Sequence, residues 1–422
     1  KVYLQVKKSL TMSQEILSKS ECIDVIFNAL NIHKSNNLCV HDFKLEPLRE
    51  ALGFMGEYYK LEIVFTIANC KPQTLPFFVK TIPTKNELQR KEVLERDVFK
   101  KEVILYRQIS KQLKPYCTSK WHADCFYSRP DLLVLENLES LGYRHIEGDF
   151  LLPELKSGLQ CLASMHATSI VYEIKSGCDI SKLLKDLHEA QVRKENTWFQ
   201  AGLDAIKAVA LAHPKYQAEI HQKFISEEFL KSLDPMYDLA KASTHFRNVL
   251  CHRDAWGKNV FFREAPGEQP ECILVDFQLA CLQPPAIDLL FFVHVNTTRS
   301  QRDEIFDWCL RTYYKTLQES LEAQHLSAEN ILRWTEFRNS CDTFKLLALV
   351  LCGVCVPLIQ LPEGFANDLK FRNPAQYQFY MTENRDELIL GMMENNCKYR
   401  ERVAETVEEL VDTVLNKNLR KH

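Results

Sequence analysis

Two short stretches decide the fold class: Cys251-His-Arg-Asp-Ala-Trp-Gly-Lys-Asn259 and, further along the chain, Ile273-Leu-Val-Asp-Phe-Gln278. Both lie in a β-rich island within a region whose hydrophobic spacing is otherwise helical. The first carries Asp254 and Asn259 on a loop, and the second carries Asp276 at the end of an apolar strand. Carboxylate and amide oxygens are ligands for Mg2+, and a carboxylate can accept a proton from a hydroxyl group. The three residues therefore fit phosphoryl-transfer chemistry, although Asp and Asn also cap ordinary turns.

The hydrophobic pattern around these stretches changes from strands to helices along the chain. Residues 13–30 have helical spacing, β-rich runs follow, and the sequence after Leu138 is mostly helical. Because strands and helices are segregated and do not alternate, the pattern favours an α+β fold over a doubly wound one. Strands are expected at 42–49, 57–68, 76–82, 123–128 and 132–136, and helices at 86–112, 151–166, 300–323, 328–352, 400–418 and within 181–243.

Composition narrows the class of protein and of partner. The 422 residues are 46% hydrophobic and 26% charged with a formal net charge of -3, so nucleic acid is not an expected partner. The 15 cysteines follow no repeating spacing and no signal peptide is visible, which predicts a reducing, cytoplasmic setting. Cys352 and Cys355 are expected to be buried structural thiols. Pro357 and Gln360 interrupt the apolar run around them, so no membrane span is predicted, and we expect a monomer.

The two stretches together resemble a known superfamily. His252-Arg-Asp-x-x-x-x-Asn259 and Val275-Asp-Phe277 are similar to the catalytic and metal-binding loops of protein-kinase-like enzymes. The continuation Gln278-Leu-Ala-Cys-Leu-Gln-Pro-Pro-Ala-Ile-Asp-Leu-Leu-Phe-Phe292 resembles the ecdysteroid-kinase-like family of arthropods, a relative of choline and aminoglycoside kinases.

This resemblance covers residues 40–415 and implies a bilobal α+β fold of the protein-kinase-like type. The N-lobe would be small, with an antiparallel sheet and one helix, and the C-lobe would be larger and mostly helical. The chain would divide into an N-terminal extension with a leading helix (1–39), an N-lobe with the nucleotide-binding sheet (40–136) and a helical C-lobe with the catalytic and metal-binding loops (137–422).

The resemblance also implies roles for residues of the C-lobe. Asp254 corresponds to the catalytic base, and Asn259 and Asp276 correspond to ligands of Mg2+. His252 and Asp288 correspond to supporting residues. A buried carboxylate at Asp288 needs hydrogen-bond donors, and in related kinases the backbone of the catalytic loop supplies them.

In the N-lobe, the resemblance implies the parts of a nucleotide site. Phe78-Val-Lys80-Thr-Ile82 supplies Lys80 to bridge the phosphates of ATP. Phe99-Lys-Lys-Glu102-Val-Ile-Leu-Tyr106 supplies Glu102 as the ion-pair partner of that lysine, with Glu95 as the alternative.

Two further segments complete the implied nucleotide site. Leu133-Val-Leu-Glu-Asn-Leu138 resembles the hinge between lobes, where backbone groups around Glu136 and Leu138 would contact adenine. Gly53 and Gly56 correspond to the turn that covers the phosphates, although two glycines before a strand are equally consistent with a plain hairpin.

The resemblance therefore implies an ATP- and Mg2+-dependent small-molecule kinase that phosphorylates a hydroxyl of an ecdysteroid-like, other lipophilic or xenobiotic acceptor. Two alternatives stay open: a kinase for choline, ethanolamine or an aminoglycoside, and a catalytically inactive nucleotide-binding protein. The presence of Lys80, Asp254, Asn259 and Asp276 speaks against inactivity. Arg253 stands where the related small-molecule kinases commonly have Gly, and the sequence offers no account of it.

Overall fold

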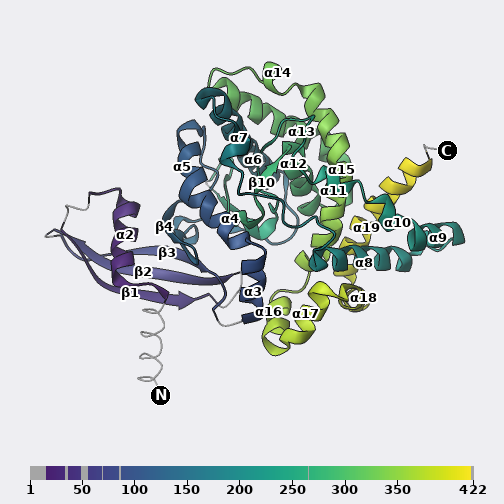
Figure 1. Ribbon diagram of the computed structural model, residues 1–422, viewed down its shortest axis with the longest axis horizontal. Helices are drawn as coiled ribbons and strands as arrows, with labels where there is room; N and C mark the ends of the chain where they lie inside the picture. The colour runs from purple at the N-terminus through teal and green to yellow at the C-terminus, as the bar shows by residue number, and fades with distance from the viewer. Residues whose placement is uncertain are drawn as a thin grey trace. The chain divides into compact units, whose positions relative to one another are not determined.

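The computed structural model describes residues 16–33, 37–48, 56–68, 70–84, 87–264 and 266–419. By their contacts these residues form two compact units, which are described separately (Figure 1). Unit 1 contains the residues up to Pro115 together with His122–His145 and Phe261–Gln278. Unit 2 contains Tyr116–Trp121, Ile146–Val260 and the residues from Leu279 onward. The sequence-based division at 39/40 and 136/137 stays a prediction.

Unit 1 is built on an antiparallel sheet of five strands in the order β1-β2-β3-β5-β4. Every second residue of β2 from Tyr59 to Phe65 is buried, which is the alternation expected of a strand with one face against a core. The α+β fold class is confirmed. The strands are β1 (Leu38–Pro47), β2 (Glu57–Ile67), β3 (Gln73–Thr81), β4 (Cys125–Arg129) and β5 (Leu132–Glu136).

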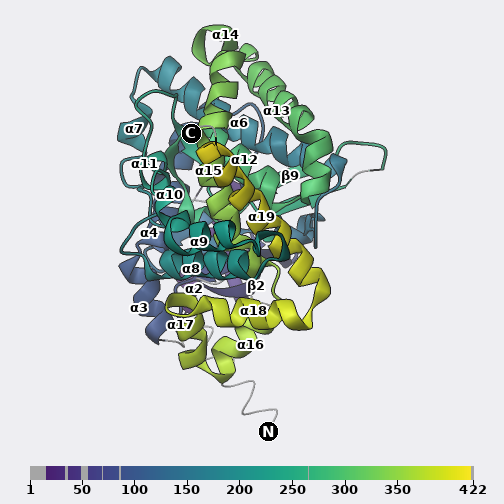
Figure 2. The same ribbon diagram turned by 90° about the vertical axis from the view of Figure 1, so that its right-hand side faces the viewer.

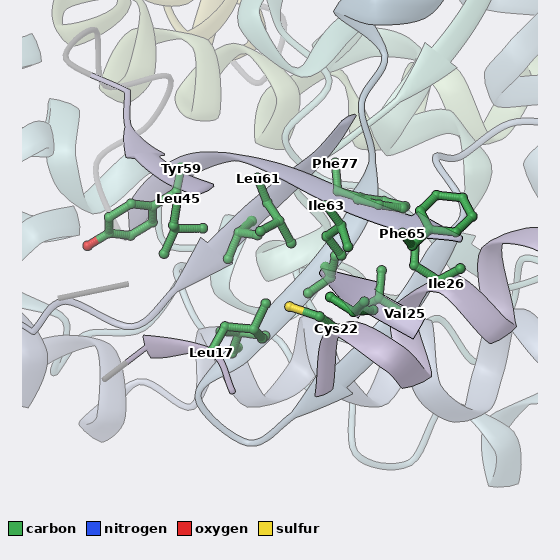
Figure 3. Close-up of a cluster of buried hydrophobic side chains, with 14 residues drawn as sticks. Leu17, Cys22, Val25, Ile26, Leu45, Tyr59, Leu61, Ile63, Phe65 and Phe77 are labelled. Atoms are coloured by element: carbon green, nitrogen blue, oxygen red, sulfur yellow. The ribbon is translucent and has the colours of Figure 1, made fainter. Parts of the chain in front are cut away.

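One face of this sheet is covered by α2 (Lys19–Leu30), which crosses the strands in Figure 1. Val25 and Ile26 of α2 belong to one buried apolar cluster with Leu61 and Ile63 of β2, and Ile26 lies beside Phe65 (Figure 3). Glu21 of the first turn also binds the sheet, because its Oε1 lies 2.6 Å from the guanidinium of Arg129 on β4. Lys80 lies on the opposite face, since its neighbour Val79 belongs to the cluster beneath α2.

The helix expected over 86–112 is interrupted in the structure. It consists of α3 (Glu87–Glu95), α4 (Val98–Ile104), a π-helical turn η1 (Leu105–Ile109) and α5 (Ser110–Leu113). Asp97 separates α3 from α4 because its backbone is left-handed, with φ of 53°. Unit 1 therefore contains several helical segments, where the sequence predicted a single helix.

The β-rich island of the sequence is divided between two small sheets. In unit 1, β6 (Arg144–His145), β8 and β9 (Glu271–Leu274) form a three-stranded sheet in the order β6-β8-β9. In unit 2, β7 (Val249–Cys251) pairs with β10 (Cys281–Gln283). The strand β8 (Val260–Arg263) begins directly after Asn259, so both motif stretches of the sequence are attached to strand ends.

Unit 2 is mostly helical. Two of its helices, α12 (Pro285–Val295) and α15 (Trp334–Ile359), are strongly apolar and pack against each other. All residues of α12 are buried. Figure 2 shows α8 running alongside α18, with which it is in contact. The helices of unit 2 are α6 (Leu152–Ser176), α7 (Ile180–Leu183), α8 (Thr197–Ala212), α9 (Glu219–Glu227), α10 (Phe229–Ser232), α11 (Met236–Leu239), α12, α13 (Arg299–Glu322), α14 (Ala328–Ile331), α15 (Trp334–Ile359), α16 (Phe365–Arg372), α17 (Pro374–Thr382), α18 (Arg385–Asn395) and α19 (Cys397–Leu419).

The apolar run around Cys352 is longer than the sequence indicated. Helix α15 continues through Pro357 and has 26 residues, so by length and composition alone it could cross a membrane. However, 78% of its most apolar window is buried inside the protein, and α15 packs against α8, α12 and α19. Of the two residues predicted to interrupt the run, Pro357 does not, because it lies inside the last turn of the helix, whereas Gln360 does, because it is the C-cap. Cys352 is buried as expected, and Cys355 is partly exposed.

Two glycines in helices of unit 2 give opposite predictions for substitution by alanine. A Cβ atom at Gly158 of α6 would overlap the ring of Phe292, whereas a Cβ atom at Gly391 of α18 would meet nothing within 4 Å. We expect Gly158→Ala to lower the free energy of unfolding by about 1–3 kcal/mol through overpacking. Gly391→Ala should raise it by about 0.5–1 kcal/mol, because alanine loses less backbone entropy in a helix. Calorimetric melting of both variants checks the pair, and equal shifts of Tm would contradict the packing of α6 against α12.

Candidate active site

The centre of unit 1 is the buried ammonium group of Lys80 on β3. Its strand neighbours are Tyr58 of β2 and Leu133 of β5, which place it in the middle of the sheet. Lys80 Nζ lies 2.7 Å from Glu102 Oε2 and 2.8 Å from Asp276 Oδ1. Lys80 and Glu102 are almost fully buried, whereas the side chain of Asp276 keeps 18% of its surface exposed. The cation of Lys80 thus brings together two carboxylates, those of Glu102 and Asp276, from distant parts of the chain.

Two local features of the backbone bring the carboxylates to Lys80. Asp276 follows β9 in a left-handed conformation with φ of 64°, which ends the strand and turns the next residues. Phe277 then packs edge-on against Tyr106 of the π-helical turn, with ring centroids 5.9 Å apart. Tyr106 comes one helical turn after Glu102, so this ring contact joins the segment of Asp276 to the helix of Glu102.

The charges of this cluster shift the protonation equilibria of Lys80 and Glu102. Burial alone would lower the pKa of Lys80, but the negative charges of Asp276 and Glu102 outweigh it and raise this pKa. Burial raises the pKa of Glu102 to about 7, because the repulsion from Asp276 adds to it and the attraction of Lys80 only partly opposes it. Lys80 is therefore firmly cationic, and the cluster has room for a further positive charge.

The alternative partner for Lys80 is excluded by its position. Glu95 lies at the end of α3 and is 65% exposed, and its side chain faces Lys91 at 3.7 Å. The ion pair expected between Lys80 and Glu102 is present, and it is the resemblance to the family pattern that singled out this glutamate. The part that either residue plays toward a nucleotide stays a prediction.

The remaining nucleotide-site predictions fall on two segments of unit 1. Gly53 lies outside the described residues, and Gly56 leads into β2 where a Cβ atom would come within 3.3 Å of the Thr81 carbonyl oxygen. In the hinge segment, Glu136 donates its backbone N–H to the Asp124 carbonyl. The Leu138 carbonyl accepts hydrogen bonds from two amides further along the chain. These bonds hold the segment in place, and its role toward adenine stays a prediction.

In unit 2, the loop after β7 holds Asp254 and Asn259 together. The Nδ2 group of Asn259 donates to the backbone carbonyl of Asp254 at 2.8 Å and to its Oδ2 atom at 2.9 Å. The backbone N–H of Asp254 donates to Nδ1 of His252 at 3.2 Å. Asn259 is buried, while Asp254 is partly exposed. The carboxylate that the sequence predicted as a base is therefore fixed on one side and accessible on the other.

Asp288 of α12 holds this loop through hydrogen bonds from the loop backbone. Its Oδ2 atom accepts the backbone N–H of His252, and its Oδ1 atom accepts that of Arg253 at 2.8 Å. Burial alone would raise the pKa of Asp288, but its hydrogen bonds with His166 and the His252 amide lower this pKa. The contacts expected of Asp288 from the sequence are present.

Sequence reasoning missed the residues behind Asp288. His166 of α6 lies with Nε2 3.1 Å from Asp288 Oδ2 and with Nδ1 2.6 Å from the Tyr313 hydroxyl of α13. His166, Cys251 and Asp288 also form a buried group with metal-ligand side chains whose ligand atoms lie within 4.8 Å of one another. However, the ligand atoms of Asp288 and His166 already form the hydrogen bonds just described, and the Cys251 thiol donates to the Gln283 carbonyl. We therefore interpret the group as a hydrogen-bonded support of the loop and not as a metal site. A histidine within the apolar helix at 151–166 was the available signal.

Arg253, for which the sequence offered no account, is a buried residue with two structural features. Its backbone is left-handed, with φ of 72°, a conformation that glycine adopts without strain. Its guanidinium lies 2.7 Å from Glu189 Oε2 and also binds Gln283. Arg253 is therefore held within the protein through both its backbone and its side chain.

Comparison with protein families decides the membership of this chain. The sequence model of the ecdysteroid kinase-like family matches residues 51–326, which is more than half of the chain. The chain belongs to this family. The matched region contains Lys80, Glu102, Asp254, Asn259 and Asp276.

Solved structures similar to this ecdysteroid kinase-like protein have low sequence identity to it, and no curated protein matches it. An ethanolamine kinase from Plasmodium vivax shares 11% identity with a TM-score of 0.40, covering 95% of this chain and 90% of that one. APH(2")-IIa, solved with gentamicin, shares 15% identity with a TM-score of 0.39, at 90% and 97% coverage. A choline/ethanolamine kinase family protein from Mesorhizobium loti shares 15% identity with a TM-score of 0.33, at 86% and 92% coverage.

The support of the Asp254 loop by Asp288 leads to a prediction about stability. Asp288→Asn replaces an acceptor with a donor facing a backbone N–H, so we expect a loss of about 3 kcal/mol in the free energy of unfolding. Asp307→Asn is the control, since Asp307 is 61% exposed and pairs only on the surface with Arg311 and Arg338; its effect should stay within about 0.5 kcal/mol.

The same substitution has a predicted pH dependence. Because the folded-state pKa of Asp288 is depressed, its contribution is present above about pH 4 and is lost on further acidification. The difference between wild type and Asp288→Asn should therefore shrink as the pH falls, as followed by chemical unfolding. If the difference in unfolding free energy between wild type and Asp288→Asn stays constant as the pH falls below about 4, the depressed pKa assigned to Asp288 is contradicted.

Proposed function

We propose that this protein is an ATP- and Mg2+-dependent kinase that phosphorylates a hydroxyl group of a small molecule. The observation that carries the proposal is the position of Lys80 Nζ between Glu102 and Asp276, at 2.7 and 2.8 Å. A lysine on the third strand, paired with a helix glutamate and close to an aspartate that can bind Mg2+, is the arrangement with which protein kinases hold the phosphates of ATP. Membership of the ecdysteroid kinase-like family supports the same reaction class.

Unit 1 would bind the nucleotide. Lys80 supplies a permanent positive charge for the phosphates, and Glu102 keeps that charge in place from the buried side. Asp276 of unit 1 has a hard oxygen donor with an exposed fraction of 18%, and Asn259 of unit 2 directs its amide nitrogen into its own loop, so each residue by itself fits Mg2+ chemically. Bound Mg2+ supplies neutralisation of the phosphate charge.

Unit 2 would supply the base. Asp254 accepts the proton of the acceptor hydroxyl as the hydroxyl oxygen forms a bond to the γ-phosphorus of ATP. The bond between that phosphorus and the bridging oxygen breaks, which gives the phosphorylated acceptor and ADP. Asn259 holds the carboxylate at Oδ2, so the geometry of Asp254 is set before the acceptor binds.

For the acceptor we propose an ecdysteroid-like or other lipophilic alcohol. Besides the family membership, an apolar cluster in unit 2 supports this choice, because its partly buried members are rich in aromatic side chains. The buried members are Leu358, Met381 and Leu388, and the partly buried ones are Trp198, Leu361, Phe365, Tyr377, Tyr380 and Met392.

The test of the reaction is Asp254→Asn, assayed by mass spectrometry with ATP, Mg2+ and a panel of ecdysteroids, other sterols, plant phenolics and choline. Wild type should phosphorylate a lipophilic alcohol, and the variant should lose on the order of 100-fold or more in kcat, because a carboxamide accepts no proton. Binding of ATP should be unchanged. Turnover by the variant at the wild-type rate would refute the base, and turnover of choline alone would refute the acceptor class.

A matched pair of glutamates tests the nucleotide site. Glu102→Gln removes the carboxylate partner of Lys80, so we expect the KM for ATP to rise and kcat to fall by about 10-fold or more. Glu95→Gln should leave both constants unchanged, because Glu95 is an exposed residue that faces Lys91. Steady-state kinetics with varied ATP measure the two effects, and equal behaviour of the variants would contradict the role of Glu102.

A further inference from the structure

Arg253 immediately precedes the proposed base and is held in a conformation that is unfavourable for its residue type. Its φ of 72° lies in the left-handed region, which costs a non-glycine residue about 1–2 kcal/mol. Such strain persists only where the surroundings enforce it, and it is concentrated at functional sites. The side chain of Arg253 is therefore the feature to explain, since glycine would fit the backbone better.

Two sets of contacts enforce this conformation. The backbone N–H of Arg253 donates to Asp288 Oδ1 at 2.8 Å, which fixes the turn of the loop. The Nη1 group donates to Glu189 Oε2 at 2.7 Å and to Gln283 Oε1, and only about 1% of the Arg253 side chain is exposed. Glu189 lies far from the loop in sequence, in the segment between α7 and α8.

Glu189 in turn organises the segment in which it lies. Its Oε1 atom accepts the backbone N–H groups of Gln191 at 2.6 Å and Val192 at 3.0 Å. Asn196 continues the connection, because its side chain donates to the Gln191 carbonyl at 2.9 Å and accepts the N–H of Phe199 at 3.3 Å, which caps α8. A continuous series of hydrogen bonds thus leads from the residue beside Asp254 to the start of α8.

We propose that Arg253 and Glu189 form a clasp that positions the segment 184–196 and the Asp254 loop relative to each other for binding of the acceptor. Arg253 is then a positioning residue, which sets the place of the Asp254 loop through both its backbone and its side chain. The acceptor role rests on the proposed function, whereas the clasp itself rests on the contacts within unit 2.

Energetics favour positioning over simple stabilisation. A buried ion pair contributes little net stability compared with apolar side chains of the same size, because both charges lose their hydration. The left-handed backbone of Arg253 adds a further cost. The strained backbone and the buried guanidinium both cost free energy, so stability alone does not account for an arginine at position 253.

The first arm of the test needs no enzymatic activity. Hydrogen exchange of the full-length protein is compared for wild type, Glu189→Gln, Arg253→Met and Arg253→Lys. Faster exchange at 184–196 and 252–259 is expected in the first two variants, with partial recovery in Arg253→Lys, since one ammonium can replace Nη1. Arg247→Met is the control, because it removes an Arg–Glu ion pair with Glu173 elsewhere in unit 2. Unchanged exchange at 184–196 in both Glu189→Gln and Arg253→Met would overturn the clasp.

The second arm is kinetic and uses the best alcohol found for wild type. Glu189→Gln and Arg253→Met should raise the acceptor KM, or lower kcat/KM for the acceptor, by roughly 10- to 100-fold, as expected for a misplaced base. The KM for ATP should not change, and the double variant should be no worse than the poorer single variant. An equal loss toward ATP and acceptor, or additive losses, would overturn the positioning role. If wild type phosphorylates no acceptor, the proposed function fails, while the exchange experiment still decides the clasp.

Discussion

The structure of unit 1 depends on one ammonium group held between two carboxylates in a buried position. Removing Lys80 from water is favourable only if Glu102 and Asp276 approach it closely, and both distances are below 3 Å. This requirement ties together a sheet strand, a helix and a strand end that are far apart in sequence. The charges of Lys80, Glu102 and Asp276 thus lie within one buried cluster, in which the pKa of Glu102 is raised and that of Lys80 is raised as well.

In unit 2 the buried charge is the carboxylate of Asp288, and its partners are mainly backbone N–H groups. Asp288 accepts the N–H groups of His252 and Arg253, and His166 lies against it from the side of α6. The loop that carries Asp254 thus has its shape set by a buried anion on an entirely buried helix. Both units use the same physical principle: a buried charge is stable only where every partner is in place, so its surroundings become rigid.

The sequence predicted the parts of the site that a motif encodes. Spacing placed Asp254 and Asn259 on one loop and Asp276 at a strand end, and family resemblance identified Glu102 ahead of Glu95. The helix at 86–112 was less predictable, because its hydrophobic spacing is continuous and gave no sign of the left-handed Asp97 between α3 and α4. The helix expected over 328–352 continues through Pro357 to Ile359, and α15 packs against α8, α12 and α19.

Two pairs that sequence reasoning missed, His166 with Asp288 and Arg253 with Glu189, join residues more than 60 positions apart. His166 meets Asp288, and Arg253 meets Glu189, only after the helices of unit 2 have packed. By itself the sequence determined the fold class and the family, since those depend on local pattern and residue identity. Tertiary structure alone decided which buried charges are paired, because a hydrogen bond or an ion pair requires an approach within about 3 Å that no local pattern encodes.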